Sequence, residues 1–351
     1  MTGAALFVGS DGQVVTRHDL PPVTARDDEI LIDVVYSGVN PADLKIVHFT
    51  NFRNSVSGTD FCGMVLDCPA LVDSGFKVGD IVAGQSVAHG EYSKEYGAHK
   101  PRISTPKLGL FRVPENMPRP DAAAITTVSH TASDALYNNF KLPLPGSSTD
   151  VVEGTLVVWG GGTAVGLSAI QLARASGVTN IITTASLPRH DLLRGLGATE
   201  CFDYKDADVS DKVRQAVIKT GHSRVWGFET AGSLESSQLL LGALTNINAD
   251  TQFSWVNATG AQRPPSESVL GSRDYDIVFE VAGGRHVIPA EPGKASNMWA
   301  ALDWVVKSYG KGFELPVVRV FEGTGEKALE EMETVSKQGT FGKLVLKHPL
   351  Q

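Results

Sequence analysis

The stretch Val157-Val-Trp-Gly-Gly-Gly-Thr-Ala-Val-Gly-Leu-Ser-Ala-Ile-Gln-Leu-Ala173 decides the fold class of this chain. The apolar run that begins after Gly154 and ends at Trp159 predicts a strand buried on both faces. Glycines follow it, and an uninterrupted helical pattern follows the glycines. In that order they predict a β-strand, a tight turn and an α-helix, which together open a βαβ unit.

The small residues of this turn suit the binding of a dinucleotide. Gly160 lets the chain turn tightly, and Gly166 lets the helix pack close to the strand. The residues between them let a pyrophosphate approach the backbone, where amide groups at the helix N-terminus bind the anion. The residues predicted to hold the pyrophosphate are Gly160, Gly162, Thr163, Ala164 and Val165. Because the spacing departs from G-x-G-x-x-G, a tight turn without a ligand stays the alternative.

The rest of the chain divides into two patterns. Short strands punctuated by glycine predict a β-rich N-terminal module of barrel type; they cover residues 29–36, 59–66, 81–84 and 90–96. Strands that alternate with helices predict a parallel sheet further on; these strands cover residues 154–159, 180–185, 225–228 and 253–256. The fold class is therefore α/β, with a β-rich module and a doubly wound domain. Residues 258–296 look loop-rich.

The end of the second parallel strand indicates which dinucleotide would bind. NAD-specific sites carry an acidic residue about 20 residues after the glycines, to hold the ribose 2′-hydroxyl. This chain has Ser186 there instead, with Arg189 and His190 just behind. A hydroxyl and a cation suit a 2′-phosphate, so we expect NADPH; the alternative is that both basic residues are solvated. Tyr204 could pack near the adenine ribose, and Asn257 follows a strand at the end where cofactors bind.

Composition excludes several other classes of function. The chain has 351 residues and a formal net charge of −8, which disfavours nucleic acid or an anionic membrane as a partner. No apolar stretch reaches the ~18 residues that a membrane span needs. The three cysteines have no framework spacing, which is typical of a reducing compartment. We therefore expect a cytoplasmic protein.

With these residues in place, the chain resembles the zinc-free, quinone-oxidoreductase-like branch of the medium-chain dehydrogenases/reductases. Within it, the chain is most similar to the fungal ToxD-like reductases and the trans-acting enoyl reductases of polyketide synthases. The resemblance runs through the whole chain in order, in the segments 38–45, 58–63, 77–80, 90–93, 122–127, 159–166, 202–204 and 342–345. It implies a GroES-like catalytic domain with an inserted Rossmann domain. The expected division is 1–121 (GroES-like), 122–260 (Rossmann, NADP-binding) and 261–351 (return to the catalytic domain).

The resemblance also predicts that no zinc is bound. Zinc-containing relatives carry cysteine and histidine ligands and a lobe of four cysteines. This chain has Asn40 and Asp43 at the first ligand position, Thr59 and Asp60 at the second, and no cysteine cluster. Zinc prefers Cys and His in tetrahedral arrangement. We expect Thr59 and Asp60 either to line the pocket or to satisfy backbone groups.

Without zinc, the acceptor must be polarised by hydrogen bonds or by a proton donor. Lys45 is the first candidate, because the resembling fungal reductases place a lysine there; the alternative is a surface lysine. The resemblance puts Asn40 near the nicotinamide ribose, although Asn-Pro could simply build the turn. Further candidates are Thr127 and Thr131 on the nicotinamide side, and Lys343 in a segment that closes over the nicotinamide. His48 and Tyr92 could act as acids or be structural.

The function that these features imply is an NADPH-dependent enoyl reductase, which transfers a hydride to the C=C bond of an α,β-unsaturated carbonyl compound or thioester. A quinone or aldehyde reductase is the alternative within enzymes, and a non-catalytic, cofactor-binding partner protein is the alternative of another class. The substrate could be a free small molecule or be presented by a carrier, with a polyketide synthase as partner. The chain is expected to be a monomer or a homodimer.

Overall fold

The computed structural model describes residues 3–24, 29–49, 52–68, 75–86, 97–256, 269–281, 284–338 and 340–351. The chain forms two compact units. The first comprises Met1–Thr127, Arg273–Glu291 and Pro316–Gln351, and the second comprises Val128–Ser272 and Pro292–Leu315. The chain therefore leaves the first unit and returns to it, as the resemblance predicts for a GroES-like domain with an insertion.

The first unit is built on a mostly antiparallel, seven-stranded sheet in the order β16-β17-β3-β5-β6-β8, with β7 paired to β3. Its strands are β3 (Glu29–Gly38), β5 (Asp60–Asp67), β6 (Ile81–Gln85), β7 (Arg102–Pro106), β8 (Leu110–Arg112), β16 (Val318–Phe321) and β17 (Lys343–Lys347). A three-stranded sheet, β2-β1-β4, is formed by β1 (Ala5–Val8), β2 (Val14–Arg17) and β4 (Ser55–Val56). Helices α1 (Ala42–Phe49) and α8 (Gly325–Gln338) pack against each other.

Apolar residues of the central sheet make the core of this unit, and Ile32, Phe61 and Val82 are fully buried in it. Successive residues of a strand point to opposite faces, and the first four residues of β5 and the last four of β6 are all buried, so both faces of the sheet are covered there. Cys62 and Cys68 are buried here, as expected of small apolar core residues. The predicted strand over 90–96 lies outside the described residues.

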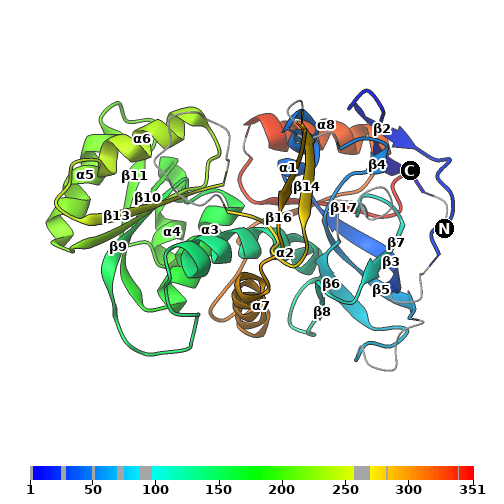
Figure 1. The fold of residues 1–351 in the computed structure, drawn as a ribbon, viewed down its shortest axis with the longest axis horizontal. Coiled ribbons are helices and arrows are strands. Elements are labelled where there is room, and N and C mark those ends of the chain that lie inside the picture. Colours follow the sequence, from blue (N-terminus) through cyan, green and yellow to red (C-terminus); the bar gives the residue numbers. More distant parts are fainter. Residues whose placement is uncertain are drawn as a thin grey trace. The chain divides into compact units, whose positions relative to one another are not determined.

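The second unit contains a five-stranded parallel sheet in the order β11-β10-β9-β12-β13 (Figure 1). Its strands are β9 (Val152–Trp159), β10 (Val178–Ala185), β11 (Glu200–Asp203), β12 (Arg224–Glu229) and β13 (Asp250–Trp255). Helices α3 (Ala164–Ala175) and α4 (His190–Leu196) lie on one side of the sheet, and α5 (Val209–Thr220) and α6 (Leu234–Leu244) lie on the other. This is a doubly wound Rossmann-like sheet, as predicted.

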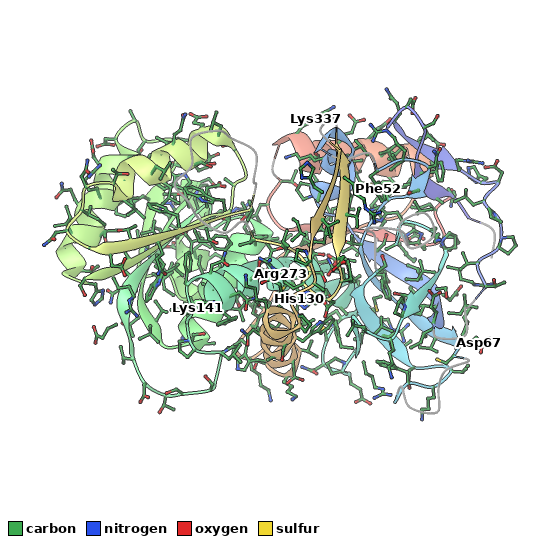
Figure 2. The ribbon with its side chains drawn as sticks, in the orientation of Figure 1. Phe52, Asp67, His130, Lys141, Arg273 and Lys337 are labelled. Carbon is green, nitrogen blue, oxygen red and sulfur yellow. The ribbon has the colours of Figure 1, made fainter. Side chains whose placement is uncertain are left out.

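Helix α2 (Arg119–Ser133) carries the chain from the first unit into the second and continues as the π-helical segment η3 (Asp134–Asn139). In the second unit, η3 packs against α7 (Pro292–Lys307). The ring of His130, labelled in Figure 2, meets Trp299 of α7 edge-on, with the ring centroids 4.7 Å apart. The carboxylate of Asp134 accepts from the amide of Leu270 at 2.9 Å.

Two sequence expectations differ from this arrangement. The predicted division keeps residues 292–315 with the catalytic domain, whereas the structure groups them with the second unit, because α7 packs on η3. The stretch expected to be loop-rich contains a hairpin of β14 (Ile277–Val281) and β15 (Gly284–Ile288). No helix in the described part of the chain is long and apolar enough to cross a membrane.

Candidate functional site

A turn rich in glycine joins β9 to α3, and three of its positions admit no side chain. Gly160 has a φ of +96°, which favours glycine, and a Cβ there would lie 3.0 Å from Oγ1 of Thr230. A Cβ on Gly161 would lie 2.1 Å from Oγ1 of Thr183, and one on Gly166 would lie 2.4 Å from the carbonyl oxygen of Gly160. The helix therefore starts directly against the end of the strand, as the sequence predicts.

The N-terminus of α3 offers amide groups to a ligand. Thr163 caps the helix, since its Oγ1 accepts from the amide of Gly166 at 3.0 Å. The amides of Ala164 and Val165 have no hydrogen-bond partner among the residues that the structure describes, and both residues are half-buried. Unpaired amides and the positive end of the helix dipole together favour an anion at this place.

A hydrogen-bond chain fixes this turn to the neighbouring strand. The hydroxyl of Thr163 donates to Oγ1 of Thr230 at 3.1 Å, and Oγ1 of Thr230 lies 2.8 Å from the carbonyl oxygen of Gly160. Thr230 follows β12, which pairs with β9 on the side opposite β10. The strand order reverses at β9, and ligands of open α/β sheets bind at such a switch point.

Glu229 lies at the same end of β12 and is fully buried. Its Oε1 accepts from the amides of Ala231 and Gly232 at 2.7 and 2.8 Å, and from the hydroxyl of Ser236 at 2.8 Å. This carboxylate shapes the bend that carries Thr230. Sequence analysis missed both residues, and the only signal was that they follow a predicted parallel strand at its carboxyl end.

The residues predicted to select the cofactor follow β10 and β11. Ser186 and Arg189 are half-buried at the end of β10, where the amide of Arg189 donates to the carbonyl of Ser186 at 2.9 Å. His190 instead turns inward, with Nε2 3.0 Å from the carbonyl oxygen of Ala185. Tyr204, after β11, is 49% exposed, and Nζ of Lys205 lies over its ring, 5.9 Å from the ring centroid.

The first unit holds a second polar cluster, which we call the buried polar chain: Lys343, Asn40, Asp60 and Thr127. Nζ of Lys343 donates to Oδ1 of Asn40 at 2.7 Å, and Nδ2 of Asn40 donates to Oδ2 of Asp60 at 3.0 Å. Oδ1 of Asp60 accepts from the hydroxyl of Thr127 at 2.5 Å and from its amide at 3.1 Å. Lys343 and Asp60 are 5% and 0% exposed, so charged groups are removed from water here.

Burial shifts the pKa of both charged members toward the neutral form. It lowers the pKa of Lys343, against the opposing effect of Asp60 and Asp43. It raises the pKa of Asp60, against the opposing effects of Lys343, Asn40 and Thr127. Buried ions are tolerated when they are paired and hydrogen-bonded, which this arrangement provides.

A further set of buried hydrogen bonds is linked to the buried polar chain through Asp43. Oδ2 of Asp43 accepts from the amide of Asn40 at 2.7 Å and lies 3.2 Å from Nε2 of His99. The hydroxyl of Ser37 lies 2.8 Å both from Nδ1 of His99 and from Nε2 of His348. Burial, and then the proximity of His99, lowers the pKa of His348 to about 3.

The structure brings some predicted site residues together and leaves others apart. Asn40, Thr127 and Lys343 meet in the buried polar chain, and the ammonium of Lys343 is committed there. Lys45 is exposed on α1, with no side-chain partner among the described residues. Thr131 is half-buried on α2. Tyr92 and Asn257 lie outside the described residues, as does the side chain of His48 in α1.

The residues at the positions where zinc-containing relatives carry ligands do not suit a zinc ion. Both oxygens of Asp60 accept from protein donors, and the ammonium of Lys343 lies 3.8 Å from Oδ2. Asn40 and Thr59 supply neither thiolate nor imidazole, the ligands that zinc prefers. Among the described residues, no group of three or more His, Cys, Asp or Glu side chains could hold a metal ion.

Comparison with known proteins places these features in a family context. Residues 26–115 match the alcohol dehydrogenase GroES-like domain, and residues 164–290 match the zinc-binding dehydrogenase family. The chain is 29% identical over 245 residues to the trans-enoyl reductase phm4 of a Pyrenochaetopsis species, which is 70% of this chain and 67% of that protein. It is 30% identical over 276 residues to a zinc-type alcohol dehydrogenase-like protein of Schizosaccharomyces pombe, 76% of this chain and 77% of that protein.

A solved structure shares the fold along the whole chain. An alcohol dehydrogenase superfamily protein from Novosphingobium aromaticivorans superimposes with a TM-score of 0.72. The superposition covers 99% of each chain at 20% sequence identity. At this identity the likeness supports the fold, a GroES-like unit with a Rossmann-like sheet, and nothing about the substrate.

Proposed function

Since this chain belongs to the medium-chain dehydrogenase/reductase superfamily, we propose that it is an NADPH-dependent enoyl reductase. The reaction would transfer a hydride to the C=C bond of an α,β-unsaturated carbonyl compound or thioester. Oxidoreductase chemistry follows from the superfamily. The cofactor, the bond that is reduced and the residues that act are the content of the proposal.

The glycine turn is the observation that carries the proposal. A Cβ at Gly160, Gly161 or Gly166 would meet neighbouring protein atoms at 3.0 Å or less, so only glycine lets the turn and the helix lie this close to the sheet. The unpaired amides of Ala164 and Val165 suit two oxygens of a pyrophosphate. These residues fit a dinucleotide, which supplies the hydride from its dihydronicotinamide when it is bound.

The end of β10 favours NADPH over NADH. The hydroxyl of Ser186 and the guanidinium of Arg189 are suited to a 2′-phosphate, because Arg binds phosphate through several donors at once. No carboxylate follows β10 within this turn to accept from a 2′-hydroxyl: the next residues are Ser186, Leu187 and Pro188. Arg189 then gives the site the positive charge that a phosphate ester needs.

The first unit offers an exposed lysine that suits the reduction of a conjugated C=C bond. Hydride addition to the β-carbon leaves an enolate, which must be stabilised and then protonated at the α-carbon. Lys45 is exposed and makes no side-chain contact with a described residue, so its ammonium is available to donate to the enolate oxygen. The relative phm4 is itself named a trans-enoyl reductase, which supports the choice of an enoyl substrate. A polyketide synthase carrying that enoyl group is the partner we propose.

The proposal is tested with the purified protein, NADPH and a short 2-enal, with the product identified by chromatography. The saturated aldehyde is the expected product. An allylic alcohol would replace the proposal with carbonyl reduction, and binding of NADPH without turnover of free or carrier-bound enoyl substrates would favour a non-catalytic partner protein. Absence of NADPH binding would contradict it altogether.

The role of Lys45 is tested by Lys45→Met, with Lys107→Met as the matched control, since both lysines are exposed. Loss of turnover, with NADPH binding unchanged, is expected only for Lys45→Met. Equal turnover of the two variants would remove Lys45 from the mechanism.

A further inference from the structure

The first turn of α1 is held by its own acidic residue, Asp43. Oδ2 of Asp43 accepts from the amide of Asn40 at 2.7 Å, and the amide of Asp43 donates to the carbonyl of Asn40 at 3.0 Å. Such reciprocal bonds cap a helix, because they pair backbone groups that the helix itself leaves unsatisfied. Lys45 follows in the same turn, and its amide donates to the carbonyl of Pro41 at 3.1 Å. The carboxylate of Asp43 therefore fixes the turn that carries Lys45.

His99 binds the same carboxylate from a separate segment of the first unit. Its Nε2 lies 3.2 Å from Oδ2 of Asp43, and the two side chains are 0% and 2% exposed. A carboxylate accepts hydrogen bonds and donates none, so Nε2 carries the proton of this bond whether the ring is neutral or charged. The hydroxyl of Ser57 donates to the carbonyl of Asp43 at 2.8 Å. Two buried side chains thus anchor Asp43 to the rest of the unit.

The ring of His99 is itself held in one place. Gly58 has a φ of +91°, and a Cβ there would lie 2.6 Å from two ring carbons of His99, so the ring packs directly on this backbone. Nδ1 of His99 lies 2.8 Å from Oγ of Ser37 in β3. The amide of His99 donates to the carbonyl of Ser57 at 3.0 Å, and its carbonyl accepts from the amide of Leu6 at 3.0 Å. His99 therefore presents a hydrogen-bond donor to α1 at a fixed point.

Loss of this donor would leave the buried carboxylate of Asp43 poorly paired. Asp43 is buried, and a buried carboxylate with too few donors is unfavourable by more than the lost bond, because it has given up its hydration as well. The carboxylate then becomes more stable by turning toward water. Because it also caps α1, this movement shifts the first turn of the helix, and Lys45 moves with it.

We propose that His99 is a positioning residue for the reaction: it holds Asp43, and through Asp43 the turn of α1 that carries Lys45. The inference rests on the proposed function, in which the ammonium of Lys45 donates to the enolate oxygen. All the contacts that carry it lie within the first unit. A displaced Lys45 would stabilise the enolate less well, because catalysis depends on the position of the donor to within about 1 Å.

Hydrogen exchange of the backbone amides in residues 40–49, followed by mass spectrometry, tests whether His99 holds α1. His99→Leu removes the donor and should speed exchange there roughly threefold to tenfold, the value of one hydrogen bond. His99→Gln, whose Nε2 can donate to Asp43, should exchange like wild type. Thr105→Val is the matched control, because its hydroxyl is buried in the first unit without a partner among the described residues. Wild-type exchange in His99→Leu would overturn the proposal.

Turnover of a 2-enal with NADPH tests whether His99 acts through Lys45. His99→Leu should lower kcat roughly threefold to tenfold and leave the dissociation constant of NADPH unchanged, and His99→Gln should restore kcat. In the Lys45→Met background, His99→Leu should change the residual turnover by less than about twofold, because the residue through which it acts is already missing. An equal loss in both backgrounds would show a merely structural role and overturn the proposal.

Should His99→Leu not fold, His99→Phe replaces it in both measurements, since it keeps a flat ring on Gly58 and has no donor. Failure of wild type to reduce the enal, or full turnover in Lys45→Met, would contradict the proposed function and with it the catalytic part of the inference. Hydrogen exchange needs no turnover, so it separates that failure from a failure of His99 to hold α1.

Discussion

Oγ1 of Thr230, at the end of β12, lies 2.8 Å from the carbonyl oxygen of Gly160, at the end of β9. This contact joins the two strands between which the sheet order reverses. Thr163 adds its own hydrogen bond to Thr230, so the turn that precedes α3 is held by a residue 67 positions later in the chain. The position of the free amides therefore depends on the whole sheet.

Thr230→Val should weaken NADPH binding by about tenfold, because the glycine turn loses the hydroxyl that accepts from Thr163. Thr230→Ser keeps the hydroxyl and should bind like wild type. Fluorescence titration with NADPH measures both dissociation constants. Wild-type affinity in Thr230→Val would mean that the turn is held by the sheet without this contact.

Gly166→Ala should lower the free energy of unfolding by about 1–3 kcal/mol, since its Cβ would lie 2.4 Å from the carbonyl oxygen of Gly160. Gly195→Ala in α4 is the control, because a Cβ there meets nothing within 4 Å. This substitution should raise the free energy of unfolding, by at most about 1 kcal/mol. Urea denaturation measures both. Equal effects of the two substitutions would show that α3 can move away from the turn at little cost.

Arg189→Ala should reduce NADPH affinity by roughly tenfold or more while leaving NADH affinity near the wild-type value, because only NADPH carries the 2′-phosphate. Arg194→Ala in α4, the helix that begins directly after Arg189, is the matched control: Arg194 pairs with Asp191 at 2.8 Å and is half-exposed. Titration with NADH and with NADPH measures the dissociation constants of both variants. A parallel loss for NADH and NADPH would indicate that Arg189 acts on the fold.

His348→Gln should make the protein less sensitive to acid. The pKa of His348 is lowered from 6.5 to about 3 by burial, so between these values the unfolded chain binds a proton that the folded chain does not. Stability therefore falls as the pH falls through this window, by about 1.4 kcal/mol per pH unit. From pH 6.5 to 4.5, the free energy of unfolding of His348→Gln should fall by about 2 kcal/mol less than that of wild type.

Urea denaturation at several pH values gives this comparison. Because the two proteins differ only at His348, the difference between the two curves gives the effect of this side chain. Parallel curves would mean that His348 is already protonated in the fold, with its charge balanced by a neighbour.

Features that arise within one short segment were predictable from sequence. The strand, turn and helix around Gly160 follow from an apolar run, glycines and a helical pattern in direct succession, so the parallel sheet and its glycine turn could be named in advance. That Ser186 and Arg189 follow β10 could also be expected, because they lie at a known distance from the glycines; their part in cofactor choice stays a prediction. The domain boundary near residue 292 was not, since only packing on η3 assigns α7 to the second unit.

By itself, the sequence determined the fold class and the local geometry of the glycine turn, because backbone conformation and hydrophobic periodicity act over a few residues. Only the tertiary structure decided which distant polar groups meet. Lys343 reaches Asn40 across 303 positions of sequence, and Thr127 reaches Asp60 across 67. Burial of such groups is costly unless each finds a partner, and the partners exist only when the sheets have formed. The contacts of Lys343 therefore depend on the folded sheet and on no local pattern.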